Sequence, residues 1–394
     1  MHVLIIPSEH FVTDKSPLAG IFQSDLANLL ASNSVKVGVI APGFISPRFL
    51  LSTYPFAKVE SLNSLNILRQ YRRRVIPEKY RSAAVLVRQY TNLGMKLYDE
   101  YVAIYGVPDL VHAHGFLFAG SVAARINKQN GVRTVVTEHS SLYLRNLIEH
   151  KYFDEIRRVA DFAVEVSAVS AALAQAIENI LDNPKVTISV LPNQLPKLED
   201  RPFRSTNADL DNGFRYISIG SLDSNKNHQL LIKAFAKLAI RENVTLKIVG
   251  AGPLKKSLEK LSRELRIENR VFFTGQKTRY EVSHLLANSD CLVVSSKVET
   301  FGVVILEAFS AGIPVISTRC GGPEELIDSS NGLLVDSSSV DEMALAMEQI
   351  RCDYAKFDAK NLVNDVEKNY GQSRHLRSVM DFYRLALGQS EAMT

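Results

Sequence analysis

Short runs of β-branched and aliphatic residues alternate with amphipathic stretches along almost the whole chain. Strands that alternate with helices of roughly 10–15 residues are typical of parallel sheets covered by helices on both faces. The expected strands are residues 3–6, 35–40, 110–112, 134–137, 162–166, 186–190, 216–219, 246–249, 271–273, 292–294 and 315–317. The expected helices include residues 21–30, 119–128, 228–239, 254–265, 280–287 and 302–311. The sequence therefore predicts an α/β fold built from doubly wound parallel sheets.

The alternation breaks once, at residues 191–213 (LPNQLPKLEDRPFRSTNADLDNG). Three prolines among polar residues without periodicity indicate a linker. A chain of 394 residues is also too long for one ordinary domain. We therefore expect one domain at 1–190 and a second at 214–370. Residues 371–394 are expected to form a C-terminal helix that packs back toward the first domain.

The composition excludes several classes of protein. With 46% hydrophobic and 22% charged residues, the chain is neither disordered nor fibrous. No run of about 18 apolar residues predicts a spanning helix, and MHVLIIPSEH fits a first strand better than a signal peptide. Cys291, Cys320 and Cys352 are widely spaced, which favours a reducing cytoplasm over a disulfide frame or metal cage. The net charge of +4 leans weakly toward anionic partners.

The strongest local signal is CLVVSSKVETFGVVILEAFSAGIPVIST at 291–318. A buried strand ends near Ser296, Glu299 follows in the turn, and a helix is predicted from about Gly302. At a rise of about 1.5 Å per residue, Glu307 lies roughly one and a half turns inside that helix. The first N–H groups of a helix are unpaired and attract anions. Two carboxylates around such a helix start suit a nucleotide sugar, because a carboxylate can accept two hydrogen bonds from a vicinal diol. Taken singly, Glu299 is as readily a helix-dipole complement and Glu307 a surface charge.

Ligands of open parallel sheets bind beyond the carboxyl ends of the strands, so the other strand ends are also informative. Lys226 precedes a predicted helix in GSLDSNKNHQLL, where it can either clamp a phosphate or be a solvated turn lysine. GAGPLKK at 250–256 begins like a dinucleotide loop, but Lys255 stands where the third glycine is required. Gly250 therefore belongs either to a plain turn or to a loop facing a nucleotide. No nucleic-acid partner is expected.

These motifs together resemble the retaining family 4 glycosyltransferases of the GT-B fold, also called glycosyl transferases group 1. ETFGVVILE, AGIPVIST and GGPEELI are similar to the second domain of that family, and GSLDSNKN to its donor-phosphate turn. DLVHAHG, TVVTEHSS and SPLAGIFQSDLANLL are similar to its first domain. The resemblance covers nearly the whole chain. It implies two Rossmann-like domains facing across a cleft, the first binding the acceptor and the second the nucleotide sugar.

The resemblance also implies roles for individual residues. Glu307 would hold the ribose hydroxyls, Glu299 would face the donor sugar, and Lys226 would carry the phosphate charge. The remaining donor-binding residues would be Gly20, Ser221, Gly250, Lys277 and the backbone of Phe301, Gly302, Val303 and Val304, with Gln276 beside Lys277 near the base. His139, after the strand 134–137, would contact the sugar or acceptor. A structural histidine bonded to backbone is the alternative there, and structural roles are favoured for His112 and His114.

The sequence departs from the family pattern at three positions. Ser221 stands where the family usually has an arginine, so the donor phosphate has to depend on Lys226 and the helix dipole, or on another arginine. Only Gly20, preceded by Ala19, remains of the first-loop glycines. Gln194 stands where the linker turn usually has glycine.

The expected reaction is transfer of a sugar from a nucleotide-sugar donor to a hydroxyl of a glycan or lipid-linked acceptor, with retained configuration, in bacterial-type polysaccharide or glycolipid synthesis. His139, Glu299 and Lys226 are the candidate catalytic residues. No cofactor and no metal are expected, because the single D-x-D, Asp209–Asp211, lies in the linker. A sugar-nucleotide epimerase or phosphorylase of the same fold, or a non-catalytic nucleotide-binding module, are the alternatives.

Residues 69–88 (RQYRRRVIPEKYRSAAVLVR) are rich in arginine, with aromatic and aliphatic residues interleaved. A basic amphipathic stretch can lie on an anionic membrane. It can equally be a solvated basic helix or a site for an acidic acceptor. On the first interpretation the enzyme would be a peripheral protein at the inner face of the plasma membrane, with Arg72, Arg73 and Arg74 in contact with lipid.

Overall fold

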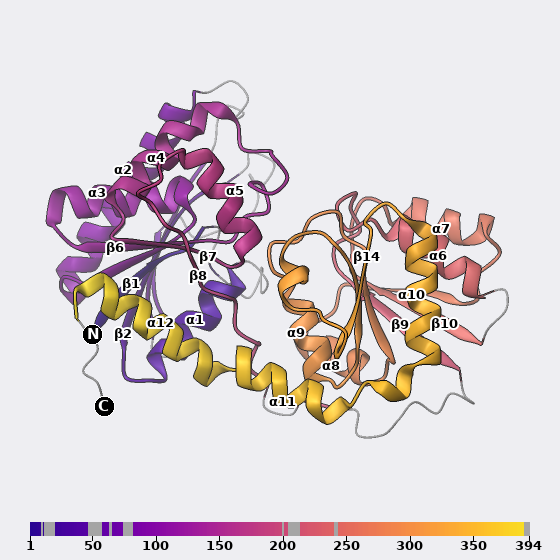
Figure 1. The fold of residues 1–394 in the computed structure, drawn as a ribbon. Coiled ribbons are helices and arrows are strands. Elements are labelled where there is room, and N and C mark those ends of the chain that lie inside the picture. Colours follow the sequence, from indigo (N-terminus) through magenta and orange to yellow (C-terminus); the bar gives the residue numbers. More distant parts are fainter. Residues whose placement is uncertain are drawn as a thin grey trace. The chain divides into compact units, whose positions relative to one another are not determined.

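A computed structural model shows the fold of the chain (Figure 1). It describes residues 1–8, 11, 20–45, 57–62, 65–73, 82–198, 201–203, 213–239 and 243–389. The chain divides into two compact units. The first unit is Met1–Leu191 together with the C-terminal residues from Leu376, and the second is Pro192–His375. Each unit has a sheet and a hydrophobic core of its own.

The sheet of the first unit has the strand order β3-β4-β2-β1-β5-β6-β7-β8. Its strands are β1 (His2–Ile6), β2 (Lys36–Ile45), β3 (Ala57–Leu62), β4 (Leu65–Arg73), β5 (Leu110–His114), β6 (Arg133–Glu138), β7 (Glu165–Ala168) and β8 (Ser189–Val190). Every neighbouring pair is parallel except β3 with β4, which form an antiparallel hairpin. The chain winds outward in one direction from β1 and in the other from β5. The carboxyl ends of β1 and β5 therefore form the topological switch point, where open α/β sheets bind ligands.

Helices cover both faces of this sheet (Figure 1). They are α1 (Ile21–Ala31), α2 (Ala83–Tyr105), α3 (Ser121–Asn130), α4 (Phe153–Phe162), α5 (Ala171–Leu181) and α12 (Gln372–Leu387), with a π-helical turn at Phe116–Gly120 and a 3-10 turn at His150–Tyr152. Helices α2, α3 and α4 lie on one face, and α1 and α12 lie on the other. The C-terminal helix contributes Val379, Phe382, Tyr383 and Ala386 to the same core as Val3 and Ile5 of β1. The last helix is thus part of the first unit's core.

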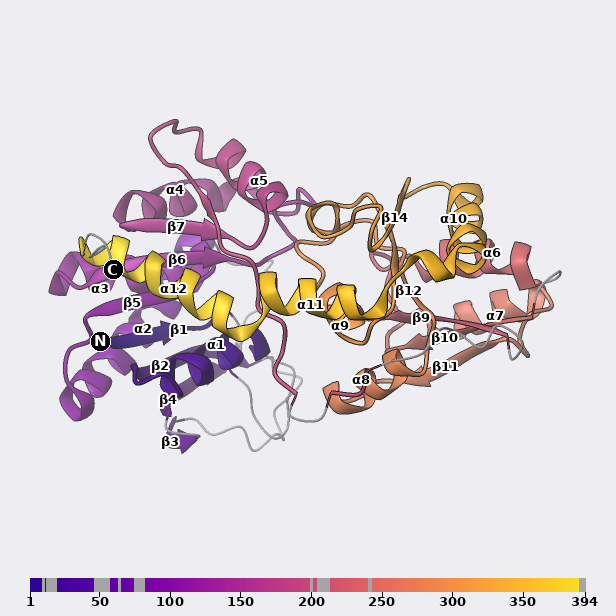
Figure 2. The same cartoon turned by 60° about the horizontal axis from the view of Figure 1, so that its bottom comes forward.

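The sheet of the second unit is fully parallel, with the order β11-β10-β9-β12-β13-β14 (Figure 2). Its strands are β9 (Phe214–Ile219), β10 (Val244–Val249), β11 (Val271–Gly275), β12 (Cys291–Val294), β13 (Val315–Thr318) and β14 (Gly332–Val335). Its helices are α6 (His228–Ala239), α7 (Lys255–Glu264), α8 (Arg279–Ala287), α9 (Val303–Ser310), α10 (Val340–Cys352) and α11 (Ala359–Tyr370), with 3-10 turns at Gly322–Glu325 and Tyr354–Lys356. The switch point lies between β9 and β12.

The doubly wound α/β fold predicted from the sequence is confirmed, and most of its predicted strands and helices lie within a residue or two of the observed ones. Two strand predictions were misplaced. Residue 162 ends α4 and β7 begins only at Glu165, while the predicted strand at 186–190 shrinks to Ser189–Val190. The β3–β4 hairpin and β14 were not predicted. β3 is a largely polar edge strand, and β4 beside it becomes rich in arginine after Leu68, so neither shows a continuous apolar pattern.

Candidate active site

The turn after β9 places Lys226 beside the second unit's switch point. Asp223 holds this turn by accepting hydrogen bonds from the backbone N–H groups of Asn225 (2.8 Å) and Lys226 (3.1 Å). Its second oxygen accepts from the Ser221 hydroxyl at 2.6 Å. Burial raises the pKa of Asp223, but these hydrogen bonds outweigh it and the net pKa is lowered. The side chain of Lys226 is thereby directed along Gly220, where a Cβ on that glycine would come within 3.1 Å of the lysine Cε.

Lys226 forms an ion pair with Glu299, which lies in the turn after β12 and 73 residues away in the sequence. The two side chains are 25% and 15% exposed, so the pair is sheltered but open to solvent on one side. The same Glu299 oxygen also accepts a hydrogen bond from the Ser296 hydroxyl at 2.6 Å. The structure thus brings together two of the three predicted catalytic residues.

The turn that carries Glu299 is fastened to its neighbours through the backbone. The N–H of Glu299 donates to the carbonyl of Cys320 (2.8 Å), and the N–H of Gly322 donates to the carbonyl of Glu299 (2.9 Å). On the other side, the Asn225 amide donates to the carbonyl of Val298 at 2.9 Å. These bonds connect the ends of β9, β12 and β13, so the Glu299 carboxylate is held at the switch point.

Helix α9 begins directly after this turn. Its N-cap residue is Gly302, with φ of 99°, a backbone conformation that favours glycine. No described side chain caps the helix, so its first N–H groups keep the capacity to bind an anion. Phe301 is 2% exposed, which leaves only its backbone for a ligand, whereas Val303 and Val304 are half-buried. Glu307 is half-buried within α9, as the spacing predicts.

An arginine lies close to Glu307, although not at position 221. Arg201 donates hydrogen bonds to the Ser310 hydroxyl of α9 and to the carbonyl of Pro196. Burial lowers the pKa of the Arg201 guanidinium, and the nearby carboxylates of Glu307 and Glu367 oppose that shift. Ser221 itself is exposed and engaged with Asp223. Arg201 therefore places a positive charge near Glu307 of α9.

A buried histidine lies behind Lys226. His228, the first residue of α6, is 2% exposed, and its Nδ1 has no hydrogen-bond partner among the described residues. Burial and the neighbouring Lys226 lower its pKa to about 4, with Asp223 opposing them. The imidazole is consequently neutral near pH 7 and adds no charge beneath the ion pair.

Two further predicted donor residues have local structural roles. Gly250 has φ of 146°, and a Cβ there would lie 1.8 Å from the carbonyl oxygen of Gly220. This glycine is required for the close packing of the turns after β9 and β10. Lys277 pairs with Glu281 at 2.8 Å, and this pair, together with the capping box of α8, lowers the pKa of Glu281 to about 2. Gln276 beside it is exposed.

The switch point of the first unit is dominated by imidazoles. His112 and His114 of β5 are 0% and 2% exposed, and their rings stack with centroids 4.2 Å apart. His112 shares hydrogen bonds with the Tyr383 hydroxyl of α12 (2.7 Å) and the Thr137 hydroxyl of β6 (2.8 Å). His114 Nδ1 lies 2.9 Å from Nε2 of His139, which follows β6. His139 is therefore connected to the C-terminal helix through two buried histidines, and the structural roles favoured for His112 and His114 agree with this arrangement.

Glu138, which was not predicted as a site residue, orders the backbone next to His139. It is 3% exposed and accepts hydrogen bonds from the N–H groups of Phe116 (3.0 Å), His139 (2.9 Å) and Ser140 (2.8 Å). Burial raises the pKa of this carboxyl, and the backbone hydrogen bonds oppose the shift. Gly20 lies elsewhere at this edge, as the N-cap of α1 with φ of 61°.

Asp223, Ser296 and Arg201 were also not predicted from the sequence. A signal existed for Asp223, because an aspartate two residues before a turn N–H is typical of an Asx turn. Ser296 and Arg201 carry no such local signal. Ser296 bonds to Glu299, three residues along the chain. Arg201 bonds to Ser310, 109 residues away, which only the path of the chain brings close.

The structure also bears on metal ligands, membrane-spanning helices and the thiol of Cys320. The described residues contain no group of three or more potential metal ligands, and Asp209–Asp211 lies outside them. No described helix is long and apolar enough to span a bilayer. Burial raises the pKa of the Cys320 thiol to about 11, so it is protonated near pH 7.

The basic stretch at 69–88 is not one amphipathic helix. Its first part lies in β4 and its last part in α2, while residues 74–81, including Arg74, lie outside the described residues. Arg69 is 1% exposed and donates to the carbonyl of Phe11, so it cannot reach a lipid surface. The change of structure within the stretch follows from β4 being buried against β2.

Two family models match consecutive parts of the chain. The model described as "Glycosyltransferase Family 4" matches residues 20–194, and "Glycosyl transferases group 1" matches residues 201–366. Together they cover both units, including the turns that carry Lys226, His139 and Glu299.

Some known proteins resemble the chain over nearly its whole length, and others resemble only part of it. An uncharacterized glycosyltransferase of Methanocaldococcus jannaschii is 25% identical over 92% of this chain and 93% of its own. The lipopolysaccharide core biosynthesis glycosyltransferase LpsE of Rhizobium meliloti is 38% identical over 35% of this chain and 39% of its own. The Anabaena protein HepE, solved with UDP and glucose, superposes with a TM-score of 0.71 at 19% identity, over 97% of this chain and 99% of its own. That structural likeness concerns the fold.

Proposed function

The chain belongs to the group 1, family 4 glycosyltransferases, and from this premise we propose that it transfers a hexosyl group from a nucleotide-sugar donor to a hydroxyl acceptor with retention of configuration. The family resemblance drawn from the motifs is thereby confirmed. One observation carries the proposal: the Lys226–Glu299 ion pair lies directly before the uncapped start of α9, and Glu307 lies inside that helix.

The donor is proposed to bind in the second unit as a nucleoside diphosphate sugar. The amides at the start of α9 and the Lys226 ammonium would hold the diphosphate, because both favour an anion. Glu307 would accept hydrogen bonds from the two ribose hydroxyls, and Glu299 would face the sugar. The UDP and glucose bound by HepE support this class of donor. Lys226 and Glu299 neutralise each other, so phosphate would compete with Glu299 for the ammonium.

The proposed reaction is a same-face substitution at the anomeric carbon. The acceptor oxygen forms a bond to that carbon while the bond to the diphosphate oxygen breaks, and the acceptor proton passes to the departing diphosphate. The protein's contribution is positioning and stabilisation of the negative charge on the leaving group. Lys226 and the α9 amides would supply that stabilisation, and no metal is invoked. His139 is proposed to hydrogen bond to the transferred sugar or to the acceptor.

The acceptor is proposed to be a glycan or a lipid-linked saccharide in polysaccharide or glycolipid synthesis. The partial match to a lipopolysaccharide core glycosyltransferase supports this class. An epimerase or phosphorylase of the same fold would turn over its sugar substrate without a saccharide acceptor. Product analysis by NMR with and without oligosaccharide acceptors separates these reactions, and the anomeric coupling of the product reports retention or inversion.

The first test replaces Glu307 by alanine and measures the affinity for UDP, GDP, ADP and TDP by calorimetry. The nucleotide that binds the wild type is expected to bind the variant more weakly by roughly 2–4 kcal/mol, because charge-assisted hydrogen bonds to the ribose are lost. Glu348→Ala, an exposed glutamate of α10, is the matched control and should bind normally. Unchanged affinity of Glu307→Ala for every nucleotide would remove the proposed donor site.

A further inference from the structure

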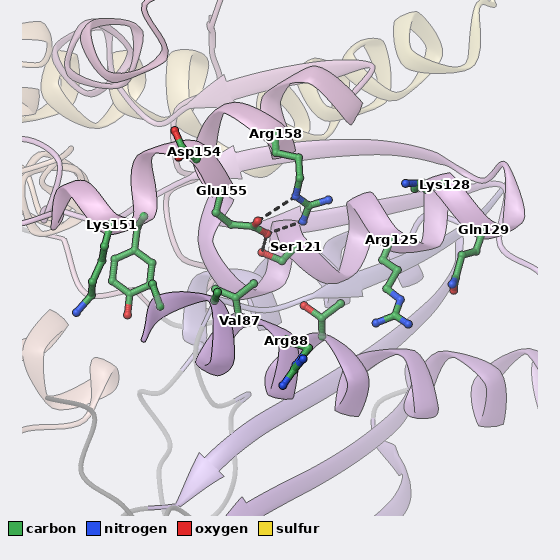
Figure 3. Close-up of a pocket in the computed structure, with 14 residues that line it drawn as sticks. Val87, Arg88, Ser121, Arg125, Lys128, Gln129, Lys151, Asp154, Glu155 and Arg158 are labelled. Atoms are coloured by element: carbon green, nitrogen blue, oxygen red, sulfur yellow. Dashed lines mark hydrogen bonds and ion pairs between the residues drawn. The ribbon is translucent and has the colours of Figure 1, made fainter. Parts of the chain in front are cut away.

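The first unit contains a cavity outside the switch points, between α2, α3 and α4 (Figure 3). Its volume is about 600 Å³, within the range of small-molecule sites. Its lining is strongly basic, with Arg88 from α2, Arg125 and Lys128 from α3, and Arg158 from α4. The proposed transfer reaction uses none of these residues.

The two acids that line the cavity are already matched by arginines. Glu155 accepts hydrogen bonds from Arg158 at 2.9 and 2.5 Å and from the Ser121 hydroxyl (Figure 3). Asp154 pairs with Arg157 at 3.5 Å, and its side chain is 99% exposed. The negative charge of the lining is therefore compensated locally.

Three cations remain around the same space. Arg125 donates to the Asn92 amide oxygen at 2.6 Å, which is a neutral partner. Within the described part of the chain, Arg88, Arg125 and Lys128 form no ion pair with a carboxylate. A fifth basic residue of the lining, Lys151, pairs with Glu149 at 2.7 Å. The cavity thus has an excess of positive charge contributed from two helices.

The wall of the cavity is in part apolar. Ala83 and Val87 of α2 are 7% and 8% exposed and line it together with the basic side chains. Thr91, one helical turn further along, is 6% exposed, and its hydroxyl has no hydrogen-bond partner among the described residues. A ligand at this wall would meet an apolar surface and a buried hydroxyl next to guanidinium groups.

We propose that this cavity is a binding site for a phosphate monoester, with the phosphate held between Arg88, Arg125 and Lys128. A guanidinium presents paired N–H donors that match phosphate oxygens. A phosphate ester carries up to two negative charges on three oxygens, so it can engage cations of both helices, whereas a single carboxylate has two oxygens and one charge. The volume leaves room for an organic group of about the size of a sugar against Ala83 and Val87. The inference concerns the first unit alone and does not depend on the transferase proposal.

The test is calorimetric titration of the full chain with glucose 6-phosphate, with glucose and glucuronate as neutral and carboxylate comparisons. The double variant Arg88→Gln/Arg125→Gln is expected to bind glucose 6-phosphate at least ten-fold more weakly than the wild type, because two charge-assisted contacts are lost. Arg263→Gln/Lys256→Gln on α7, which removes the same charge from exposed positions of the second unit, is the control and should bind as the wild type does. Repeating the titration with Lys226→Met excludes phosphate bound at the proposed donor site.

A second experiment distinguishes a soluble phosphate ester from a lipid headgroup. Co-sedimentation with phosphatidylcholine vesicles that contain phosphatidic acid measures the same phosphate on a lipid. If the wild type binds glucose 6-phosphate and the double variant does not, the ligand is a soluble phosphate ester. If the wild type binds the vesicles and only the double variant fails to, the ligand is a lipid headgroup. The proposal is overturned if neither probe binds, if glucuronate binds as well as glucose 6-phosphate, or if the α7 control loses as much affinity. Circular dichroism melting of the double variant, together with the single variant Lys128→Gln, shows whether a loss comes from misfolding.

Discussion

The switch points of the two units occupy equivalent positions in two doubly wound sheets, yet their side chains differ in kind. At the β9–β12 edge the groups are charged: the Lys226–Glu299 ion pair, the start of α9 and Glu307. At the β1–β5 edge most groups are imidazoles and hydroxyls, with His112, His114 and His139 connected by hydrogen bonds and stacking, and the one carboxyl described there, Glu138, is buried and bonded to backbone N–H groups.

The two edges can recognise different parts of a substrate. The Lys226 ammonium and the helix amides interact strongly with phosphate, and the carboxylates interact strongly with diols. The second unit is therefore suited to an ionic donor. His139, which is half-buried while His112 and His114 are fully buried, can exchange hydrogen bonds with hydroxyl groups, which are neutral and directional. The two units share a doubly wound arrangement, and the residues at and just after the strand ends give each edge a different chemistry.

Replacing Lys226 by methionine tests the charged edge and has the largest expected effect. Affinity for the nucleoside diphosphate should fall by roughly 3–4 kcal/mol, more than 100-fold, because two charge-assisted hydrogen bonds to phosphate are removed. Lys233→Met, at an exposed lysine of helix α6, which begins just after Lys226, controls for the lost charge. Calorimetry on His139→Ala should give the wild-type nucleotide affinity. An equal loss of nucleotide affinity in Lys226→Met and His139→Ala would show that the two edges do not bind different parts of the substrate.

The pH dependence of stability sharpens the comparison in the second unit. The pKa of His228 is about 4 in the fold and 6.5 in an unfolded chain, so the unfolded state binds more protons between these values. The contribution of His228 to stability should therefore be constant above about pH 6.5 and fall as the pH is lowered toward 4, by up to about 3 kcal/mol. His375, whose pKa burial also lowers to about 4, contributes with the same sign.

Urea denaturation at pH 7, 6, 5 and 4 measures this slope. His228→Gln removes one titrating group and should show a flatter decline than the wild type over the same range. A variant whose decline parallels that of the wild type would mean that the pKa of His228 is not lowered in the fold.

Replacing Tyr383 by phenylalanine tests the neutral edge and has the smallest expected effect. The change leaves Nδ1 of buried His112 without its 2.7 Å partner and should cost about 1–2 kcal/mol of stability. The ¹⁵N-histidine NMR spectrum should also report altered protonation in the His114–His139 pair. Tyr216→Phe removes an equally buried hydroxyl, which donates to Met347, from the second unit and should leave that spectrum unchanged. If Tyr383→Phe and Tyr216→Phe both give the wild-type spectrum, the C-terminal helix does not affect His139.

The sequence was most informative where a function depends on residues close together in the chain. Glu299 and Glu307 lie around the start of α9 as their spacing predicts, because the rise of a helix converts eight positions into a known distance. Gly250 illustrates the opposite case. Its local pattern left both a plain turn and a nucleotide loop open, and the structure adds that it packs against Gly220, a contact between two turns that no local pattern encodes.

By itself, then, the sequence determined the alternating α/β architecture, the family, and the position of the carboxylates around α9, since all of these follow from periodicity and short spacings. Only the tertiary structure decided that Lys226 pairs with Glu299, 73 residues away, and that Tyr383 bonds to His112, 271 residues away. It also showed that Arg201 lies near Glu307 and that arginines and a lysine of α2 and α3 surround a cavity. These contacts depend on strand order and on which helices lie side by side, and the free energy that selects them is spread over the buried core and not encoded at the contacting residues.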